Sequence, residues 1–519
     1  MKRKKLFKII FGAVAAVSLI LFLLTGLTKY VVRKKVETAL IQNNSDYSVT
    51  IDKIKISLIL STLELEGLKI NTKKDHSEGL NINGEIVSIK FQGIKPGKAL
   101  FRKEADVRIV TISEVNLSGR YSSLHDSAVS LAIPLNISVG IVHFDRINLS
   151  FENMDNAASF SLMDGGLKLN HVHILQYDTL SADAAEFFDF SANEIVWASA
   201  DSMYSFRNTG ILYSSATNSL SIDSSFIQPN YEDYDFTERF NYQKNRFEAG
   251  FSNISFHDFD LRKYLATGDF GSSFVEVSNM NMKIFRDNRK EFNHTKKPEF
   301  QDMIYNYRSN LRIDSVALLE GDVTYTEHSS EANEPGHINF NKINARVYKI
   351  TNDTIYRTDT AYLKLQADAM LMGKSKISVL LIARIFDSNN TFTLKGNLAS
   401  LQADELNPIL ENKAFVHVTS GEIQGLNFSF VADNKKSDGT LNLIYHGLNL
   451  AVRNKSTDET TAFREKFISL LVNFKVKNSN PLPGKDVRVG IINFERDPER
   501  YLINYCIRSL MSGIKSSII

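Results

Sequence analysis

Cysteine and proline are scarce in this sequence. The single Cys506 among 519 residues excludes an intramolecular disulfide framework and any metal site made of cysteines. Nine prolines are too few for a collagen-like or proline-rich disordered chain, whereas 43% apolar residues suffice for a sizeable core. The composition therefore indicates a large folded protein, long enough for several domains, without disulfide cross-links.

Net charge is also small, because 61 basic residues are balanced by 59 acidic ones. Residues 1–35 carry nine of the basic residues and no acidic residue, so the rest of the chain has 52 basic and 59 acidic residues. A nucleic-acid binder would need a basic surface to neutralise phosphates. The mildly acidic body therefore predicts no nucleic-acid partner.

Motifs that carry chemistry are missing as well. The sequence contains no GxGxxG, GxxxxGK[ST], HExxH, GxSxG or CxxC pattern. His171 and His173 could face one side of a strand, but a catalytic zinc needs three protein ligands, so a solvent-facing pair is expected. Glu232, Asp233 and Asp235 lack the EF-hand spacing and its glycine, which favours a solvated loop. We expect no enzyme activity, no cofactor and no metal site.

One long apolar run is present, at the N-terminus. Residues 9–27 contain no charged side chain and would span about 28 Å as a helix, close to the hydrocarbon thickness of a bilayer. A cleaved signal peptide is the alternative, but its apolar region is about 7–15 residues long. We predict a cytoplasmic tail at 1–8, an uncleaved transmembrane anchor at 9–28 and a body outside the cytoplasm, since long domains translocate largely regardless of charge.

Beyond a predicted juxtamembrane helix at 29–46, the apolar period changes from 3.6 to 2. Such alternation is typical of strands with one apolar and one wet face, as in an antiparallel sheet. In the first strands Lys53, Lys55 and Ser57 fall on the wet face. The apolar positions that share the other face are Ile54, Ile56, Leu58, Leu60, Leu63 and Leu65.

A hexad pattern, apolar-x-x-apolar-x-apolar, recurs along the chain and is by itself a weak repeat signal. It occurs at Ile51/Ile54/Ile56, Leu65/Leu68/Ile70, Ile112/Val115/Leu117, Phe144/Ile147/Leu149, Phe251/Ile254/Phe256, Val277/Met280/Met282 and Ile313/Val316/Leu318.

Helical periodicity interrupts the strands at a few places. Short helices are predicted at Asp258–Ala266 and Gln402–Glu411, and an amphipathic helix at 457–474. A last helix would be capped by Asp497 and stopped by Gly513, with Cys506 on its apolar stripe. The stripe of the amphipathic helix, which could cover a sheet edge or groove, consists of Phe463, Phe467, Leu470, Leu471 and Phe474.

Polar linkers at Arg286–Pro298 and Lys477–Lys485 suggest section boundaries. After the tail, anchor and juxtamembrane helix, the predicted sections are an N-terminal β section at 47–295, a second β section at 296–478, and a C-terminal strand and helix at 479–519.

The C-terminal half resembles a known family. Leu311–Glu327 has a strand, a turn at Gly321 and a second strand that ends in the aromatic Tyr325, and this is similar to the repeated signature of AsmA-like envelope proteins of the Bacteroidetes type. The resemblance covers about residues 296–519 and 1–70. Further segments in the family's order are Ala369–Leu371, Leu394–Gly396, Leu406–Glu411, Thr419–Gly421, Leu426–Phe430, Gly439–Leu450, Phe494–Asp497 and Leu510–Gly513.

This resemblance implies an elongated antiparallel β-groove anchored in a bacterial inner membrane, with a periplasmic body that binds or transfers phospholipid between envelope membranes or supports outer-membrane assembly. Ile54, Ile56, Leu58, Leu60, Leu63 and Leu65 would then line the groove. The same alternation is compatible with closed β-sandwich domains that act as an envelope scaffold with protein partners. The spacing of the apolar residues does not distinguish an open groove from closed sandwich domains.

Overall fold

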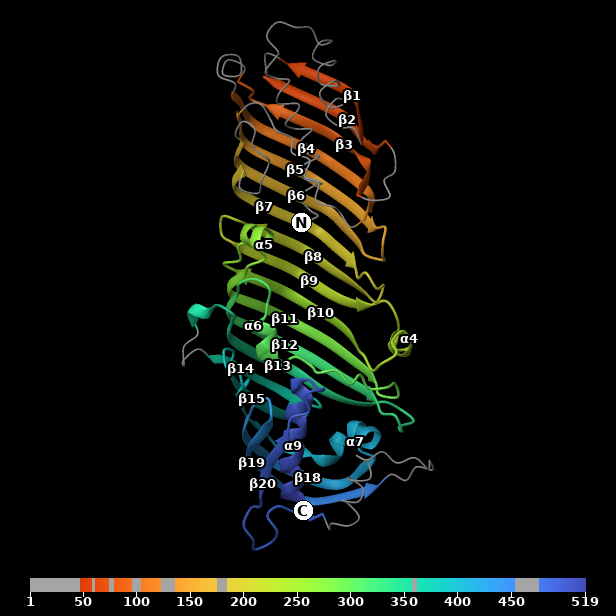
Figure 1. Ribbon diagram of the computed structural model, residues 1–519, viewed down its shortest axis with the longest axis vertical. Coiled ribbons are helices and arrows are strands. Elements are labelled where there is room, and N and C mark those ends of the chain that lie inside the picture. Colours follow the sequence, from red (N-terminus) through yellow and green to blue (C-terminus); the bar gives the residue numbers. More distant parts are fainter. Residues whose placement is uncertain are drawn as a thin grey trace. The chain divides into compact units, whose positions relative to one another are not determined.

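The computed structural model describes residues 47–57, 61–73, 79–95, 104–122, 136–174, 184–356, 362–452 and 476–519. Within these ranges the protein is mostly β-structure, with twenty strands and a few short helices (Figure 1). The chain divides into two compact units, Met1–Ser225 and Phe226–Ile519.

The described part of the first unit is made of long strands. They are β1 (Tyr47–Ser57), β2 (Thr62–Thr72), β3 (Leu80–Gln92), β4 (Glu104–Tyr121), β5 (Asn136–Asn153), β6 (Ser159–Ile174), β7 (Ala185–Ala198), β8 (Tyr204–Ser214) and β9 (Ser219–Pro229), the last of which crosses the boundary between the units.

The second unit adds helices to its strands. Its strands are β10 (Asn245–His257), β11 (Phe270–Asp287), β12 (Leu311–His328), β13 (Gly336–Thr351), β14 (Tyr362–Leu371), β15 (Ser375–Arg384), β16 (Phe392–Leu398), β17 (Leu401–Gln402), β18 (Val416–Ala432), β19 (Lys436–Val452) and β20 (Val489–Glu495). Its helices are α4 (Asp233–Glu238), α5 (Leu261–Thr267), α6 (Phe300–Tyr305), η2 (Thr354–Tyr356), η3 (Ala403–Leu406), α7 (Asn407–Lys413) and α9 (Leu502–Ile518).

The sheet is mixed, so the expectation of a purely antiparallel sheet is wrong at two places. β4 pairs with β5 in parallel in the first unit, and β11 pairs with β12 in parallel in the second. Parallel neighbours need a crossover of a dozen or more residues, and both connections, 122–135 and 288–310, reach that length. The polar segment Arg286–Pro298 is therefore the end of β11 and part of this crossover.

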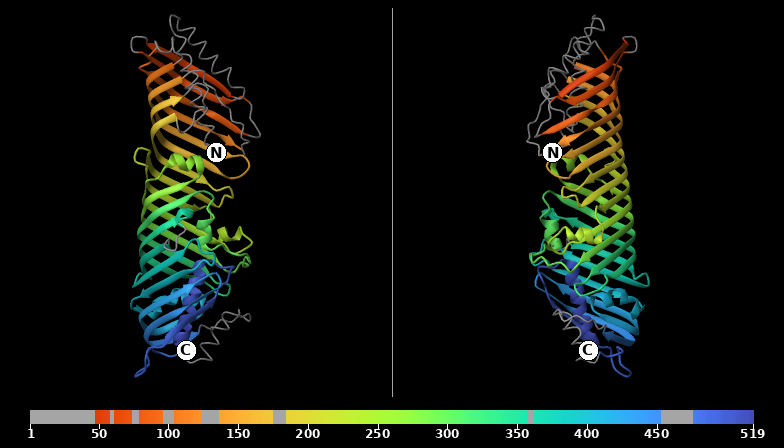
Figure 2. Two further views of the ribbon diagram at one scale, coloured as in Figure 1. Left: turned by 60° about the vertical axis from the view of Figure 1, so that its left-hand side comes forward. Right: turned by 90° about the vertical axis from the view of Figure 1, so that its right-hand side faces the viewer.

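Within each unit, consecutive strands pair side by side in one open layer instead of forming two facing sheets. The strands of this layer are strongly bent, as the side views show (Figure 2). The closed sandwich is therefore not the arrangement of the described strands.

β-Bulges explain the hexad pattern. The third hexad position has a left-handed backbone, with positive φ, in five of the seven hexads: Gly67, Glu114, Arg146, Asn253 and Asn279. A residue in this conformation adds one position to the strand and raises its local twist. The apolar residues before and after it therefore stay on one face although their spacing is odd.

Polar side chains on the other face accept hydrogen bonds from backbone amides at the bulges. The Asp164 amide donates to Asn148 Oδ1 at 3.0 Å, and the Lys342 amide donates to Asp322 Oδ1 at 3.2 Å. Asn148 and Asp322 each come two residues after a left-handed residue of their own strand. β5 and β12 thus each supply an acceptor for the bulge of the next strand, which leaves these two amides paired.

The two short helices predicted from the sequence are present. α5 lies inside Asp258–Ala266 apart from its last residue, and the Asp260 carboxylate accepts from the Lys263 amide at its N-terminus. η3 and α7 cover the predicted Gln402–Glu411 apart from its first residue, which belongs to β17.

The C-terminal helix differs from the prediction. α9 starts at Leu502 with Tyr501 as N-cap, whereas Asp497 accepts from the Glu499 amide in a preceding turn. Gly513 lies inside the helix and does not end it. Its missing side chain allows α9 to pack closely on Leu441 and Ile492.

α9 also lies along the edge of β20. The amides of Ile491 and Asn493, which point away from β19, donate to the hydroxyls of Ser516 and Ser512 at 3.1 and 3.2 Å. Because the two serines are four residues apart, they lie on one face of the helix and match alternate residues of the strand. The helix therefore covers a strand edge that would otherwise invite pairing with another chain.

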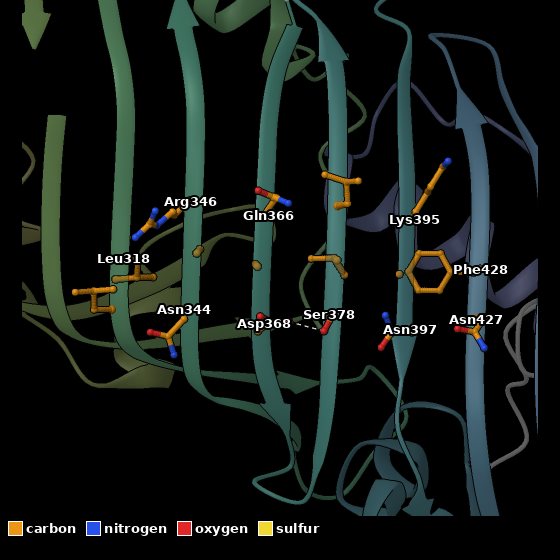
Figure 3. A pocket seen from close by; sticks show the side chains of 16 residues that line it. Leu318, Asn344, Arg346, Gln366, Asp368, Ser378, Lys395, Asn397, Asn427 and Phe428 are labelled. Atoms are coloured by element: carbon orange, nitrogen blue, oxygen red, sulfur yellow. Dashed lines mark hydrogen bonds between the residues drawn. The ribbon is translucent and has the colours of Figure 1, made fainter. Parts of the chain in front are cut away.

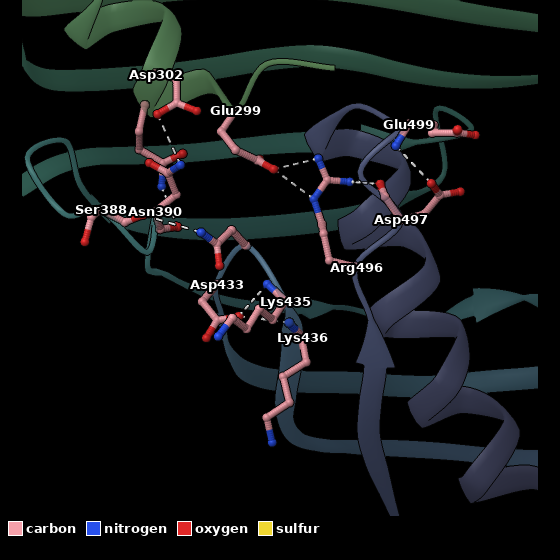
Figure 4. Close-up of polar contacts among 12 residues, drawn as sticks. Glu299, Asp302, Ser388, Asn390, Asp433, Lys435, Lys436, Arg496, Asp497 and Glu499 are labelled. Atoms are coloured by element: carbon pink, nitrogen blue, oxygen red, sulfur yellow. Dashed lines mark hydrogen bonds and ion pairs between the residues drawn. The ribbon is translucent and has the colours of Figure 1, made fainter. Parts of the chain in front are cut away.

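A buried ion pair fastens the β11–β12 crossover to the C-terminal segment (Figure 4). Arg496 Nη2 and Nε lie 2.9 and 3.1 Å from Glu299 Oε1, and the two side chains are 1% and 10% exposed. Beside it, Gln301 Nε2 donates to the Asn390 carbonyl at 2.8 Å.

Several predicted segments lie outside the described residues: the tail at 1–8, the anchor at 9–28, the juxtamembrane helix at 29–46 and the amphipathic helix at 457–474 with Phe463, Phe467, Leu470, Leu471 and Phe474. Among the helices that are described, none is both long and apolar enough to cross a bilayer.

Candidate functional site

The first unit presents apolar residues in rows that cross its strands in register. Residues paired across neighbouring strands share a face, so each row is continuous. One row consists of Ile51, Leu68, Ile86, Val115, Ile147, Gly165, Ala192 and Ile211, and the next of Ile54, Leu65, Ile89, Ile112, Phe144, Leu167, Phe190 and Tyr213.

The structure brings together four of the six groove residues predicted from the sequence. Ile54 pairs with Leu65, and Ile56 pairs with Leu63, in the β1–β2 register. Leu63 and Leu65 are buried and the two isoleucines are partly buried against the same core. Leu58 and Leu60 lie outside the described residues.

Burial is uneven among the apolar residues of the first unit. Core residues of β2 to β4, such as Leu65, Ile89 and Ile112, are completely buried. In contrast, Trp197 of β7 is 39% exposed and stacks on Phe206 of β8 with a centroid distance of 5.2 Å. Trp197 is therefore an accessible apolar side chain away from the predicted groove residues, although Ile211 and Tyr213, where the two rows cross β8, are buried.

The second unit has equivalent rows with more accessible side chains. One row crosses ten strands: Phe256, Val275, Val316, Val347, Leu365, Leu381, Leu394, Phe430, Gly439 and Ile492. Its end at Phe430 and Ile492 is buried with Tyr505 and Ile518 of α9, whereas Val316 and Val347 are only half-buried. α9 therefore covers one end of this face and leaves β10 to β14 more open.

Two shorter rows extend the open part across β10 to β13. Their half-buried or exposed members include Met282 and Val323 in one row, and Phe247, 38% exposed, in the other. In register, the rows are Ala249, Met282, Val323 and Phe340, and Phe247, Ile284, Tyr325 and Ile338. We call these two rows the open apolar face.

A shallow depression of about 610 Å³ crosses β12 to β18 (Figure 3). Its lining includes Arg346, Gln366 and Lys395, which alternate along their strands with the apolar rows. The lining also includes a row that pairs in register two residues along each strand from the apolar row, so polar and apolar residues line the depression together. This row consists of Leu318, Ala345, Ala367, Val379, Gly396 and Phe428.

The open apolar face ends at charged side chains. Tyr325 Oη donates to Glu327 Oε2 at 2.7 Å, and Lys413 Nζ lies 2.8 Å from the same oxygen. Burial alone would raise the pKa of Glu327, but Lys413 and the hydrogen bonds from Lys413 and Tyr325 hold this pKa below its ordinary value. The carboxylate is therefore ionised although it is buried.

The other residues considered from the sequence form no common site. His171 Nδ1 lies 2.8 Å from Glu186, and His173 Nδ1 lies 3.2 Å from Ser138, so the two imidazoles have different partners. No group of three potential metal ligands occurs among the described residues.

The acidic cluster and the cysteine have structural surroundings. Asp233 and Asp235 belong to α4, with Glu232 as its N-cap, so the expected loop is wrong here, and Asp233 pairs with Arg246 at 3.2 Å. Cys506 of α9 packs against the core, and burial raises its pKa to about 12.

Comparisons with known proteins add no relatives: no protein-family model matches the chain, and no curated protein matches it. The open apolar face and its charged end were missed by sequence reasoning, because hexads mark strands but do not show which strands stay uncovered. Function is therefore argued from these surfaces.

Proposed function

We propose that this chain is an inner-membrane-anchored, periplasmic envelope protein that holds phospholipid acyl chains against the apolar face of its sheets. The supporting observation is the set of in-register apolar rows, continuous over eight strands in the first unit and ten in the second. Eight strands spaced by about 4.8 Å extend roughly 34 Å. The resemblance to AsmA-like proteins gives the same reading, and no catalytic role is proposed.

The open apolar face is the part best suited to lipid. Large apolar side chains such as Phe247, Met282 and Val323 remain accessible there, and accessible apolar patches mark ligand or partner sites. Each methylene that such a face removes from water contributes about 0.8 kcal/mol. Direct contact with acyl chains would therefore stabilise both the face and the lipid.

A scaffold that binds envelope proteins is the second candidate. It is favoured by the complete burial of Leu65, Ile89 and Ile112, because a filled core in the first unit has no room for a ligand. In a scaffold, the alternating apolar residues would only fill the core and would not contact a ligand.

Native mass spectrometry of the detergent-extracted protein tests the proposal. We expect co-purified phospholipid with wild type, and a folded but lipid-poor Val323→Asp variant, since the carboxylate would lie on the open apolar face. Thr324→Asp, on the other face of the same strand, is the matched control and should keep its lipid. Wild type without lipid, or a folded Val323→Asp variant with its full lipid content, would favour the scaffold.

A further inference from the structure

The open apolar face changes abruptly into a charged row. Directly beyond Phe247, Ile284, Tyr325 and Ile338, the next positions on the same face are Asn245, Arg286, Glu327 and Gly336, again paired in register. Two residues along each strand therefore separate an apolar surface from ionic side chains. Such a boundary matches a molecule that is itself apolar at one end and charged at the other.

Arg286 is held in place by neutral partners. Its guanidinium donates to Gln243 Oε1 at 2.7 Å, Asn245 Oδ1 at 2.9 Å and Asn288 Oδ1 at 2.7 Å. These amides fix the orientation of the side chain without neutralising its charge.

Further cations gather around Arg286. Arg500 stacks over the Phe292 ring at 3.6 Å and has Asp497 Oδ2 at 3.8 Å. Burial, and then repulsion from Arg286, lower the pKa of Arg500. Arg508 of α9 is close enough to Glu327 and Asp497 for their charges to raise its pKa, although burial lowers the pKa overall.

The resulting charged rim consists of Arg286, Lys413, Arg500 and Arg508 with the carboxylates Glu327 and Asp497. Lys413 pairs with Glu327 and Arg500 pairs with Asp497, whereas the described hydrogen bonds of Arg286 go to neutral amides. Among the described residues the Arg286 charge is therefore the one that an added anion would offset. The positive end of the α9 dipole adds to this positive charge, since α9 begins two residues after Arg500 and has no acidic residue in its first turn.

We infer that the charged rim binds the anionic group of an amphiphile whose apolar tail lies on the open apolar face. The inference rests on the proposed function and specifies the ligand: a phosphate-bearing lipid or a fatty acid, not a neutral lipid. Arginine suits both anions, because its planar guanidinium donates two parallel hydrogen bonds to phosphate or carboxylate.

Calorimetric titration of the full chain in non-ionic detergent tests this ligand class. The probes are 1-palmitoyl lysophosphatidate, palmitate, neutral 1-palmitoylglycerol and inorganic phosphate. We expect both anionic amphiphiles to bind at least about tenfold more tightly than palmitoylglycerol. The tighter of the two identifies the source of the anion, and inorganic phosphate alone should not bind measurably.

Variants of rim residues test whether the preference for anionic amphiphiles arises at the charged rim. Arg500→Gln and Arg286→Lys should reduce the anion preference severalfold and leave the affinity for palmitoylglycerol unchanged, which also reports that the apolar face is intact. Arg312→Gln, at an exposed arginine paired with Asp314, is the control and should change nothing. Equal binding of charged and neutral probes by wild type would overturn the inference and spare the proposed function. Failure of every amphiphile to bind would overturn both, and phosphate binding without amphiphile binding would do the same.

Discussion

At the scale of single residues, the buried Glu299–Arg496 pair makes the fold sensitive to the loss of one partner. Arg496→Met would leave the Glu299 carboxylate buried without its partner, at a cost of about 3–5 kcal/mol. Urea unfolding should show this loss. Arg312→Met, at an exposed pair, should unfold like wild type. The double variant Glu299→Leu/Arg496→Met should recover part of the loss, and a double variant worse than the single one would contradict this account.

Glu327 gives the protein a defined acid sensitivity. Its pKa is lower in the folded chain than the ordinary value of about 4.3 in unfolded chains, so ionised Glu327 stabilises the fold above that pH. The contribution should disappear as the pH falls through the lower, folded pKa. Urea midpoints measured from pH 7 down to about 3 should therefore fall less steeply for Glu327→Gln than for wild type. Parallel curves would show that Glu327 does not carry this dependence.

Site residues were predictable from the sequence only where the alternation of apolar residues within a single strand assigns them to one face. Ile54, Ile56, Leu63 and Leu65 share a face because alternation within a strand fixes it. The neighbours Arg286 and Glu327 are 41 residues apart and meet through a parallel pairing. Alternation carries no information about that register.

At the scale of elements, close packing of α9 on β20 depends on two glycines. A Cβ on Gly490 would clash with the Gly513 carbonyl oxygen, which is backbone and has no freedom to turn away. Gly490→Ala should therefore destabilise the second unit by about 1–3 kcal/mol, the usual range for overpacking. Thermal melting should register this, whereas Gly271→Ala, with nothing within 4 Å of the new methyl, should melt within the error of wild type.

The helix ends and strand pairings show which features the local sequence can predict. Asp260 caps α5 as a local sequence rule predicts, because the cap needs only its own helix. Gly513 seemed to end α9, yet the helix continues, since contact with Ile492 and Leu441 offsets the roughly 1 kcal/mol that an interior glycine costs. The parallel pairs were missed although long connections at 122–135 and 288–310 signalled them.

At the scale of the whole molecule, the proposed topology predicts that Ile519 is periplasmic. A reporter active only in the cytoplasm, fused after Ile519, should be silent, and one that needs export should be active. The control is the cytoplasmic reporter fused at the N-terminal tail, where it should be active. Cytoplasmic activity at the C-terminal fusion would contradict the proposed topology.

The open sheet was not deducible from the sequence, because an apolar face is equally suited to a second sheet or to a groove. Strand-to-strand pairing settles this within each unit, where one layer continues from β1 to β8 and from β10 to β20. Hydropathy alone records that a face avoids water, not what covers it.

The left-handed bulge residues also constrain how such a chain can change in length. In β4, inward positions are even-numbered at Val110 and Ile112 but odd-numbered at Val115 and Leu117, and Glu114 separates the two parities. Losing one residue on either side would turn every later side chain to the wrong face. Losing two would preserve parity. Viable insertions and deletions within these strands should therefore occur in pairs of residues, so that evolution lengthens or shortens each strand in steps of two.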